Sequence, residues 1–190
     1  MISEKKLLEG AEDDIKSLSV INRRYWKAPR YEKLKKFCLG SKNILSVGCG
    51  PKEPIILGSS HALDLCSISE TYLRRAGWEG SFKIGSCTSL PYEDKSFEVV
   101  VCSEVIEHLP TFQDVIQTFR EVARVGKRWI ITTPNSDVIK PANQNKHHLQ
   151  FFTLDKIKDL REHFISSDPS ILFKVSTNDH HIYMESLDGE

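Results

Sequence analysis

The most constraining feature of this chain is a short apolar segment that ends in two closely spaced glycines. Residues 44–47 read Ile-Leu-Ser-Val, and Gly48 and Gly50 follow directly. The segment predicts a short buried strand, and the glycines predict a tight turn that lets a ligand lie against bare backbone. Asp64 follows near the end of a second predicted strand, residues 61–65. A glycine turn followed by a carboxylate at the tip of the next strand predicts a parallel α/β sheet that binds a nucleoside.

The glycine turn departs from the dinucleotide-binding fingerprint G-x-G-x-x-G. Glu53 stands where the third glycine of that fingerprint belongs. The third glycine allows close packing of helix on strand beside the pyrophosphate. Its absence argues against a ligand with a pyrophosphate, and therefore against a nucleotide-dependent oxidoreductase.

Predicted strands and helices alternate along most of the chain. The strands are expected at residues 44–47, 61–65, 81–85, 97–102, 129–133, 171–176 and 182–187. The last two strands are close enough in sequence to pair as a hairpin. This order predicts an α/β fold with a doubly wound, mostly parallel seven-stranded sheet and a C-terminal antiparallel hairpin. We expect one domain over residues 1–190, with a helical lid at 1–39 and the sheet at 40–190.

Several residues mark where the helices begin and end. Ser67 to Glu70 has the form of a capping box for a helix that ends near Gly77. Thr111 and Thr153 are expected to cap two later helices, since each precedes a run with apolar residues at helical spacing. Ligands on doubly wound sheets bind beyond the carboxyl ends of the strands, so the functional residues should follow strand ends.

Four segments in order resemble the class I S-adenosylmethionine (SAM)-dependent methyltransferases, of methyltransferase type 11. They are Val47–Gly50, Gly85–Pro91, Ser96–Val100 and Ser103–Leu109, and the resemblance covers roughly residues 40–187. It implies the Rossmann-like fold of that family, SAM as the cofactor and Asp64 as the ribose-binding acid. The cofactor-binding residues expected are Gly48, Cys49, Gly50, Asp64, Leu65, Ser86, Cys87 and Ser103.

Two positions depart from the family pattern. The family usually carries an acid two residues before the first motif glycine and often another after the third strand, where this chain has Ser46 and Ser86. A hydroxyl gives a weaker contact than a carboxylate, because it lacks charge assistance. The departures raise an alternative function, a SAM-binding or apo subunit that scaffolds or activates a partner without catalysis.

The segment Glu104–His108 carries two carboxylates and an imidazole. In a helix, Glu104, Glu107 and His108 would lie on one face, where they could hold a divalent cation. His147 or His148, in the long segment 134–152, could supply a fourth ligand. Similar E-x-x-E-H segments occur in the small-RNA 2′-O-methyltransferases and the ubiquinone-pathway phenol O-methyltransferases, which are metal-assisted. The catalytic and metal-ligand candidates are therefore Glu104, Glu107, His108 and His148. General base catalysis by either histidine and a purely structural role are the alternatives.

The chemistry of SAM limits what such residues must do. Its sulfonium already makes the methyl group electrophilic, so the enzyme needs to align the nucleophile and remove a proton. A base-rich edge suits an oxygen nucleophile, which predicts O-methylation of a small molecule or a terminal hydroxyl. RNA 2′-O-methylation is the alternative, although 26 basic and 26 acidic residues leave no basic surplus for a nucleic-acid footprint.

Five cysteines, an odd number at wide spacing, do not form a recognisable disulfide framework. The first residues lack the apolar run of a signal peptide, and no apolar stretch reaches membrane-spanning length. We therefore expect a cytoplasmic protein with no membrane partner. The oligomeric state is left open by the sequence.

Overall fold

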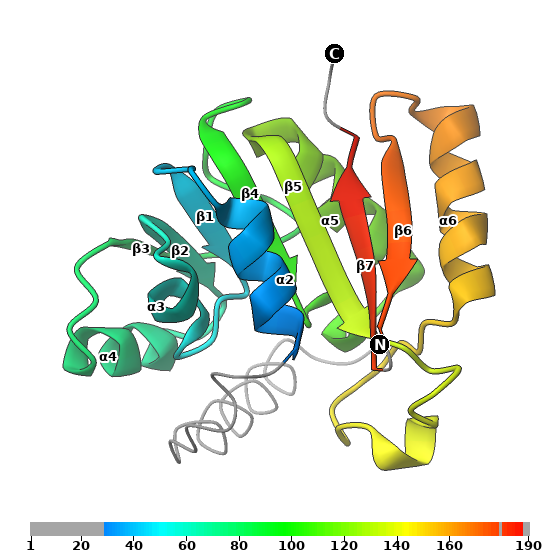
Figure 1. The fold of residues 1–190 in the computed structure, drawn as a ribbon, viewed down its shortest axis with the longest axis horizontal. Helices are drawn as coiled ribbons and strands as arrows, with labels where there is room; N and C mark the ends of the chain where they lie inside the picture. Colours follow the sequence, from blue (N-terminus) through cyan, green and yellow to red (C-terminus); the bar gives the residue numbers. More distant parts are fainter. Residues whose placement is uncertain (1–28, 179, 188–190) are drawn as a thin grey trace.

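The computed structural model describes residues 29–178 and 180–187, and they form a seven-stranded sheet in the order β3-β2-β1-β4-β5-β7-β6 (Figure 1). The strands are β1 (Ile44–Val47), β2 (His61–Asp64), β3 (Ser81–Ile84), β4 (Phe97–Ser103), β5 (Gly126–Pro134), β6 (Phe173–Thr177) and β7 (His181–Ser186). The first five run parallel, β7 pairs antiparallel with β5, and β6 pairs antiparallel with β7. The predicted sheet is confirmed, including its C-terminal hairpin.

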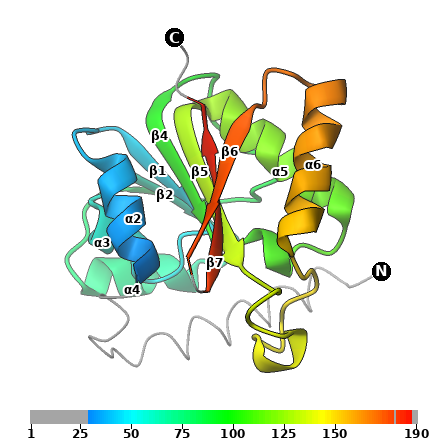
Figure 2. The same cartoon turned by 45° about the vertical axis from the view of Figure 1, so that its right-hand side comes forward.

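Helices cover both faces of the sheet, which is the doubly wound arrangement predicted (Figure 2). The helices are α2 (Pro29–Cys38), α3 (Glu53–Leu57), α4 (Ile68–Arg75), α5 (Phe112–Val125) and α6 (Leu154–Ser167), with short 3₁₀ turns η2 (Ile106–His108) and η3 (Pro141–Asn143). Apolar side chains of α5 and α6 form one core cluster with the sheet, and those of α2 and α3 form a second one. Each cluster buries one face of the strands away from water, which stabilises the fold.

Neighbouring residues of a strand face opposite helices, because side chains alternate across a sheet. On β4, Val99 and Val101 pack with α2 and α3, whereas Val100 and Cys102 pack with α5. On β5, Ile130 belongs to the α2 cluster and Ile131 to the α5 cluster. This alternation continues to the carboxyl ends of the strands and decides on which face each site residue lies.

Two of the three predicted helix caps are confirmed. The Thr111 side chain and Asp114 make a reciprocal capping box at the start of α5, and the Thr153 side chain accepts a hydrogen bond from Lys156 N at the start of α6. The capping box predicted at Ser67 is wrong. Ser67 already has helical backbone angles and makes no side-chain cap, although the helix itself begins at Ile68 as expected. A cap needs an extended residue before the helix so that its side chain can reach back to the first turn.

Only part of the predicted N-terminal lid is described. Helix α2, which begins at Pro29, is part of it, and residues 1–28 of the predicted lid lie outside the described residues. All five cysteines are buried, and none of them is part of a disulfide in the described residues. Within residues 29–178 and 180–187, no helix combines the length and apolar character needed to cross a membrane.

Candidate functional site

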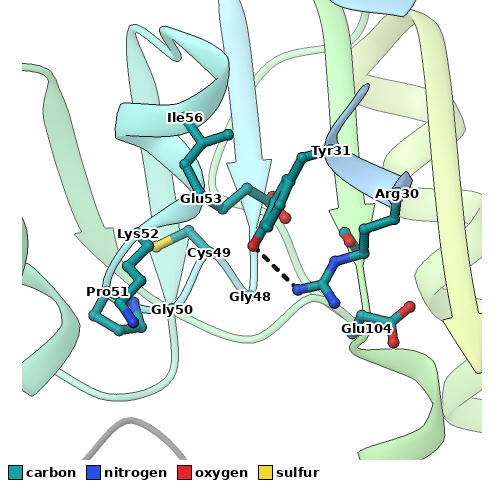
Figure 3. A pocket seen from close by; sticks show the side chains of 11 residues that line it. Arg30, Tyr31, Gly48, Cys49, Gly50, Pro51, Lys52, Glu53, Ile56 and Glu104 are labelled. Carbon is teal, nitrogen blue, oxygen red and sulfur yellow. Dashed lines mark hydrogen bonds between the residues drawn. The ribbon is translucent and has the colours of Figure 1, made fainter. Parts of the chain in front are cut away.

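A pocket lies at the carboxyl ends of β1 and β4, beneath α2 (Figure 3). Its lining comes from α2, the turn after β1, the start of α3, and the end of β4. The lining residues are Arg30, Tyr31, Gly48, Cys49, Gly50, Pro51, Lys52, Glu53, Ile56, Ser103 and Glu104. Four of the predicted cofactor residues, Gly48, Cys49, Gly50 and Ser103, are therefore part of one pocket.

The two glycines of the turn are needed for different reasons. Both have positive φ, +60° at Gly48 and +53° at Gly50, a conformation that other residues rarely adopt. A Cβ at Gly48 would lie 2.4 Å from Cγ2 of Val105, so a side chain here would require Val105 to shift. A Cβ at Gly50 would meet nothing within 4 Å. Gly50 therefore exposes its backbone to the open side of the pocket, as a cofactor-binding turn requires.

Asp64 lies behind this turn rather than in the pocket lining. Its Oδ2 accepts a hydrogen bond from Gly50 N at 2.8 Å, and its Oδ1 accepts one from Cys66 N at 2.9 Å. The carboxyl group is buried, which raises its pKa, while these two hydrogen bonds act in the opposite direction. Asp64 thus fixes the shape of the glycine turn, and its role as a ribose acceptor stays a prediction.

The third-strand residues do not reach the pocket. Ser86 Oγ lies 2.7 Å from Thr88 Oγ1 and also accepts a hydrogen bond from Thr88 N, so its hydroxyl serves a local turn. Cys87 is buried against α5, where its Sγ accepts a hydrogen bond from Thr118 Oγ1 at 3.3 Å. Leu65 is half-buried at the end of β2 and is also absent from the pocket lining. Cofactor contacts by these three residues stay predictions.

Charged residues that the motif reasoning did not select line the floor and side of the pocket. Glu53 is only 5% exposed, and burial raises the pKa of its carboxyl to about 8 despite the neighbouring Arg30 guanidinium. Arg30 projects from α2 and donates a hydrogen bond to the Tyr31 hydroxyl at 3.1 Å. Figure 3 shows Arg30, Tyr31 and Glu53 gathered above the Gly48 turn, with Glu104 beside Arg30.

The predicted helical arrangement of Glu104, Glu107 and His108 is wrong. Glu104 has φ +58°, and the helical turn begins only at Ile106. A residue in the left-handed region breaks the helical repeat, so Glu104 does not stack on the other two. Its Oε1 instead accepts a hydrogen bond from Thr132 Oγ1 at 2.9 Å, and its Oε2 lies 3.5 Å from Nε2 of His181. Glu104 therefore belongs to the pocket and not to the histidine cluster.

Glu107, His108 and His148 do converge, as predicted. Each offers one potential ligand atom, and these atoms lie within 4.8 Å of one another. Glu107 is 1% exposed, and burial together with the charge of Glu104 raises the pKa of its carboxyl well above the usual value. Its Oε2 accepts a hydrogen bond from Thr133 Oγ1 at 3.0 Å, whereas its Oε1 has no hydrogen-bond partner in the described chain. A buried carboxylate oxygen without a partner is costly and points to a missing ligand or proton partner.

The segment after β5 brings His148 to this cluster. The backbone carbonyl of Glu107 accepts hydrogen bonds from Leu149 N at 2.7 Å and Gln150 N at 2.9 Å, so the segment folds back onto η2. The rings of His108 and His148 then meet edge to face, with centroids 4.8 Å apart. Of the two predicted alternatives, His148 and not His147 joins the cluster.

Gln144 fixes the tautomer of His148. The Gln144 amide nitrogen donates to the carbonyl of Ile139 at 2.7 Å, which can only accept, so its Oε1 faces His148. That oxygen lies 2.9 Å from His148 Nδ1. Because an amide oxygen only accepts, Nδ1 carries the proton in the neutral ring and Nε2 carries the lone pair. His148 is thus held in the form that can accept a proton or bind a cation through Nε2.

His181 is the clearest residue that sequence reasoning missed. It opens β7, and its neighbour Glu104 directly follows the end of β4. Strand β5 lies between β4 and β7 in the sheet. Burial lowers the pKa of His181, although Glu104 acts in the opposite direction. Only the antiparallel insertion of β7 beside β5 places it here, and no local motif signals that pairing.

The chain is similar to known methyltransferases in sequence and in fold. The family model of the methyltransferase domain matches residues 45–129. One curated relative, the uncharacterized methyltransferase YcgJ of Bacillus subtilis, is 28% identical over 101 residues, which cover 48% of this chain and 39% of that protein. The chain spans 39–54% of the length of the first curated relatives it matches.

Solved structures share the fold over nearly the whole chain. A SAM-dependent methyltransferase from Thermotoga maritima has a TM-score of 0.69 at 14% identity and covers 96% of this chain and 100% of its own. An S-adenosylmethionine-dependent methyltransferase from Clostridium acetobutylicum has a TM-score of 0.63 at 11% identity, covering 97% and 99%. At such identities the likeness concerns the fold.

Proposed function

We propose that this chain, which is similar to the class I SAM-dependent methyltransferases in its matched domain and in its fold, transfers the methyl group of SAM to an oxygen nucleophile held at Glu107, His108 and His148. The observation that carries the acceptor part is the convergence of one carboxylate and two imidazoles within 4.8 Å, beside an unpartnered buried oxygen of Glu107. Oxygen nucleophiles need a proton acceptor, and this cluster is the group of residues suited to provide one.

The pocket residues fit the cofactor. Gly50 offers bare backbone to open space at the ligand edge of the sheet, and Asp64 braces it from behind. When bound, SAM supplies an electrophilic methyl group on its sulfonium. The residues of the chain have to bind it, exclude water and direct it toward the acceptor, which is catalysis by positioning.

The cluster residues would orient the acceptor and take its proton. His148 Nε2 carries the lone pair, because Gln144 holds the Nδ1 proton. Thr133 holds Oε2 of Glu107, and Oε1 has no hydrogen-bond partner among the described residues. The pocket and the cluster are close, since Glu104 of the pocket lining and Glu107 of the cluster accept hydrogen bonds from adjacent residues of β5.

The same donor set suits a divalent cation. Carboxylate oxygen and imidazole nitrogen are common ligands of Mn²⁺, Fe²⁺ and Zn²⁺. A cation held by Glu107, His108 and His148 would act as a Lewis acid that lowers the pKa of the acceptor hydroxyl. Without a cation, His148 or His108 would take the proton directly.

Calorimetry with SAM and S-adenosylhomocysteine tests the cofactor half of this proposal. We expect binding of both with one site per chain. If neither ligand binds, the alternative raised by Ser46 and Ser86 is favoured, a scaffold or activator without a cofactor.

A methyl-transfer screen tests the acceptor half. Phenols, sugars and RNA with a free 3′ end would be compared with amines and thiols, by the S-adenosylhomocysteine released. We expect turnover on a hydroxyl acceptor; turnover on amines or thiols alone would refute the proposal.

Repeating the reaction with a chelator, and then with Mn²⁺ or Mg²⁺ restored, separates the cation version of the proposal from the histidine-base version. Activity that is lost with the chelator and restored with the cation supports the cation. Activity that the chelator leaves unaffected supports the histidine base.

A further inference from the structure

Two buried polar atoms of the cofactor pocket have no hydrogen-bond partner in the described chain. One is Oε1 of Glu53 and the other is Nε of Arg30. Both residues line the pocket that contains Gly48 and Gly50. Unsatisfied buried groups are rare in folded proteins, so an acid and a guanidinium that each keep an unsatisfied atom in one pocket point to a ligand that carries both a donor and an acceptor.

The other atoms of these two residues are held in place. The Arg30 guanidinium donates to the Tyr31 hydroxyl at 3.1 Å and lies 4.6 Å from the centre of the Tyr31 ring. Ser46 and Ser103 hydrogen-bond the Glu53 carboxyl group from the ends of β1 and β4. Both serines lie on the α2 face of the sheet, by the alternation of side chains along each strand. These contacts therefore fix the positions of Oε1 of Glu53 and Nε of Arg30 in the pocket.

We propose that Glu53 and Arg30 bind the amino-acid end of SAM, with Glu53 accepting a hydrogen bond from the α-ammonium group and Arg30 donating to the α-carboxylate. This assignment rests on the proposed function, since it needs SAM as the ligand. Glu53, at the start of α3, would then supply the acidic acceptor that the family usually carries at the position of Ser46 on β1.

The charges in the pocket favour this orientation over its reverse. An ammonium group needs an acceptor, and a carboxylate needs a donor, so each end of the zwitterion has one partner. The pKa of Glu53, about 8, means that much of the carboxyl is neutral at pH 7 before binding. A cation beside it favours the ionised form. The charged and titratable groups around Glu53 are Arg30, Tyr31, Glu104, Cys38, Cys49 and Cys102.

Two ligands that differ only at the amino-acid end test the assignment. S-Adenosylhomocysteine carries the ammonium and carboxylate, whereas 5′-methylthioadenosine lacks both. Calorimetry would measure each ligand with wild type, Glu53→Gln, Arg30→Gln and the control Glu162→Gln, whose side chain is exposed on α6. We expect Glu53→Gln and Arg30→Gln each to weaken S-adenosylhomocysteine binding about ten- to a hundredfold, the cost of one charge-assisted hydrogen bond. Their affinity for methylthioadenosine should change less than twofold.

The outcomes separate this assignment from the proposed function. Equal loss for both ligands, or no loss for either, would overturn the assignment while leaving cofactor binding intact. Failure of wild type to bind S-adenosylhomocysteine would overturn both. Glutamine has the shape of a neutral glutamic acid, so Glu53→Gln should fold; if its thermal unfolding shows otherwise, Arg30→Gln decides alone by the same two affinities.

Discussion

Glu104 and Glu107 are three residues apart in one motif, yet they face different sites. Glu104 bonds to Thr132 and lies in the cofactor pocket on the α2 face, whereas Glu107 bonds to Thr133 and joins the histidine cluster. Thr132 and Thr133 are adjacent on β5, so their side chains project to opposite faces of the sheet. The difference teaches that the pleat of the neighbouring strand, and not helical spacing, assigns each glutamate its site.

If the pocket binds the cofactor and the histidine cluster acts on the acceptor, the largest effect of a substitution in the cluster should be on turnover. Glu107→Gln and His148→Gln should each lower the rate of methyl transfer by about 10²- to 10⁴-fold, the usual contribution of a proton acceptor. Their affinity for S-adenosylhomocysteine should stay within twofold of wild type, since neither residue lines the pocket. Steady-state kinetics and calorimetry measure the two quantities.

His163→Gln is the matched control, because His163 is exposed on α6 and remote in sequence from both sites. If Glu107→Gln weakened cofactor binding as strongly as it lowered turnover, the separation between pocket and cluster would be wrong.

On the pocket side, the burial of Glu53 predicts a pH-dependent stability. Its folded-state pKa of about 8 lies above the ordinary value of 4.5, so the folded protein holds a proton that the unfolded chain releases. The contribution of Glu53 to the free energy of unfolding is therefore most favourable below about pH 4.5 and falls as the pH rises to about 8. Glu53→Gln removes this loss, so its stability relative to wild type should grow with pH by up to about 1.4 kcal/mol per pH unit between those limits.

Urea unfolding of both proteins at pH 5, 6, 7 and 8 measures this difference. Glu162→Gln serves as the exposed control and should show no such trend. A constant difference between Glu53→Gln and wild type across the series would mean that Glu53 is ionised in the folded protein.

The order of strands and helices was predictable from the sequence because it depends on local signals. Apolar runs, glycine turns and threonine caps act within a few residues, and the strand at Ile44–Val47 and the helix after Thr111 follow from them. The glycine turn was predictable for the same reason. Its positive φ angles are a property of the turn itself.

The composition of the two sites was less predictable, because it depends on contacts distant in sequence. Glu53 was recognised only as a missing glycine, and Arg30 reaches the pocket because α2 packs across the sheet. The placement of Glu104 failed because helical spacing was assumed for a residue in the left-handed region. His148 was anticipated, but its neighbour Gln144, which sets its tautomer, was not.

Substitutions in the glycine turn should separate stability from binding. Gly48→Ala places a methyl group 2.4 Å from Val105 Cγ2 in a left-handed residue, which should cost about 2–4 kcal/mol in free energy of unfolding. Gly50→Ala meets no neighbour and should cost only about 1–2 kcal/mol, from the backbone alone. Its methyl group would instead occupy ligand space, so it should weaken S-adenosylhomocysteine binding.

Urea unfolding and calorimetry on the two variants make this comparison. Equal stability of Gly48→Ala and Gly50→Ala would show that Val105 moves aside freely and that this contact does not require glycine at position 48.

The smallest effect concerns Ser46, where the family usually carries an acid. Ser46 Oγ is buried and lies 2.8 Å from Ser59 Oγ, so Ser46→Ala should cost about 1–2 kcal/mol in free energy of unfolding, for one lost hydrogen bond and one unsatisfied hydroxyl. S-Adenosylhomocysteine affinity should fall less than threefold, because on our assignment Oε1 of Glu53 receives the ammonium group and Ser46 only helps to hold the carboxyl in place. A tenfold or greater loss of affinity would place the cofactor contact on Ser46 itself. In that case the acceptor for the ammonium group would lie on β1 and not on α3, and Glu53 would have no direct contact with the cofactor.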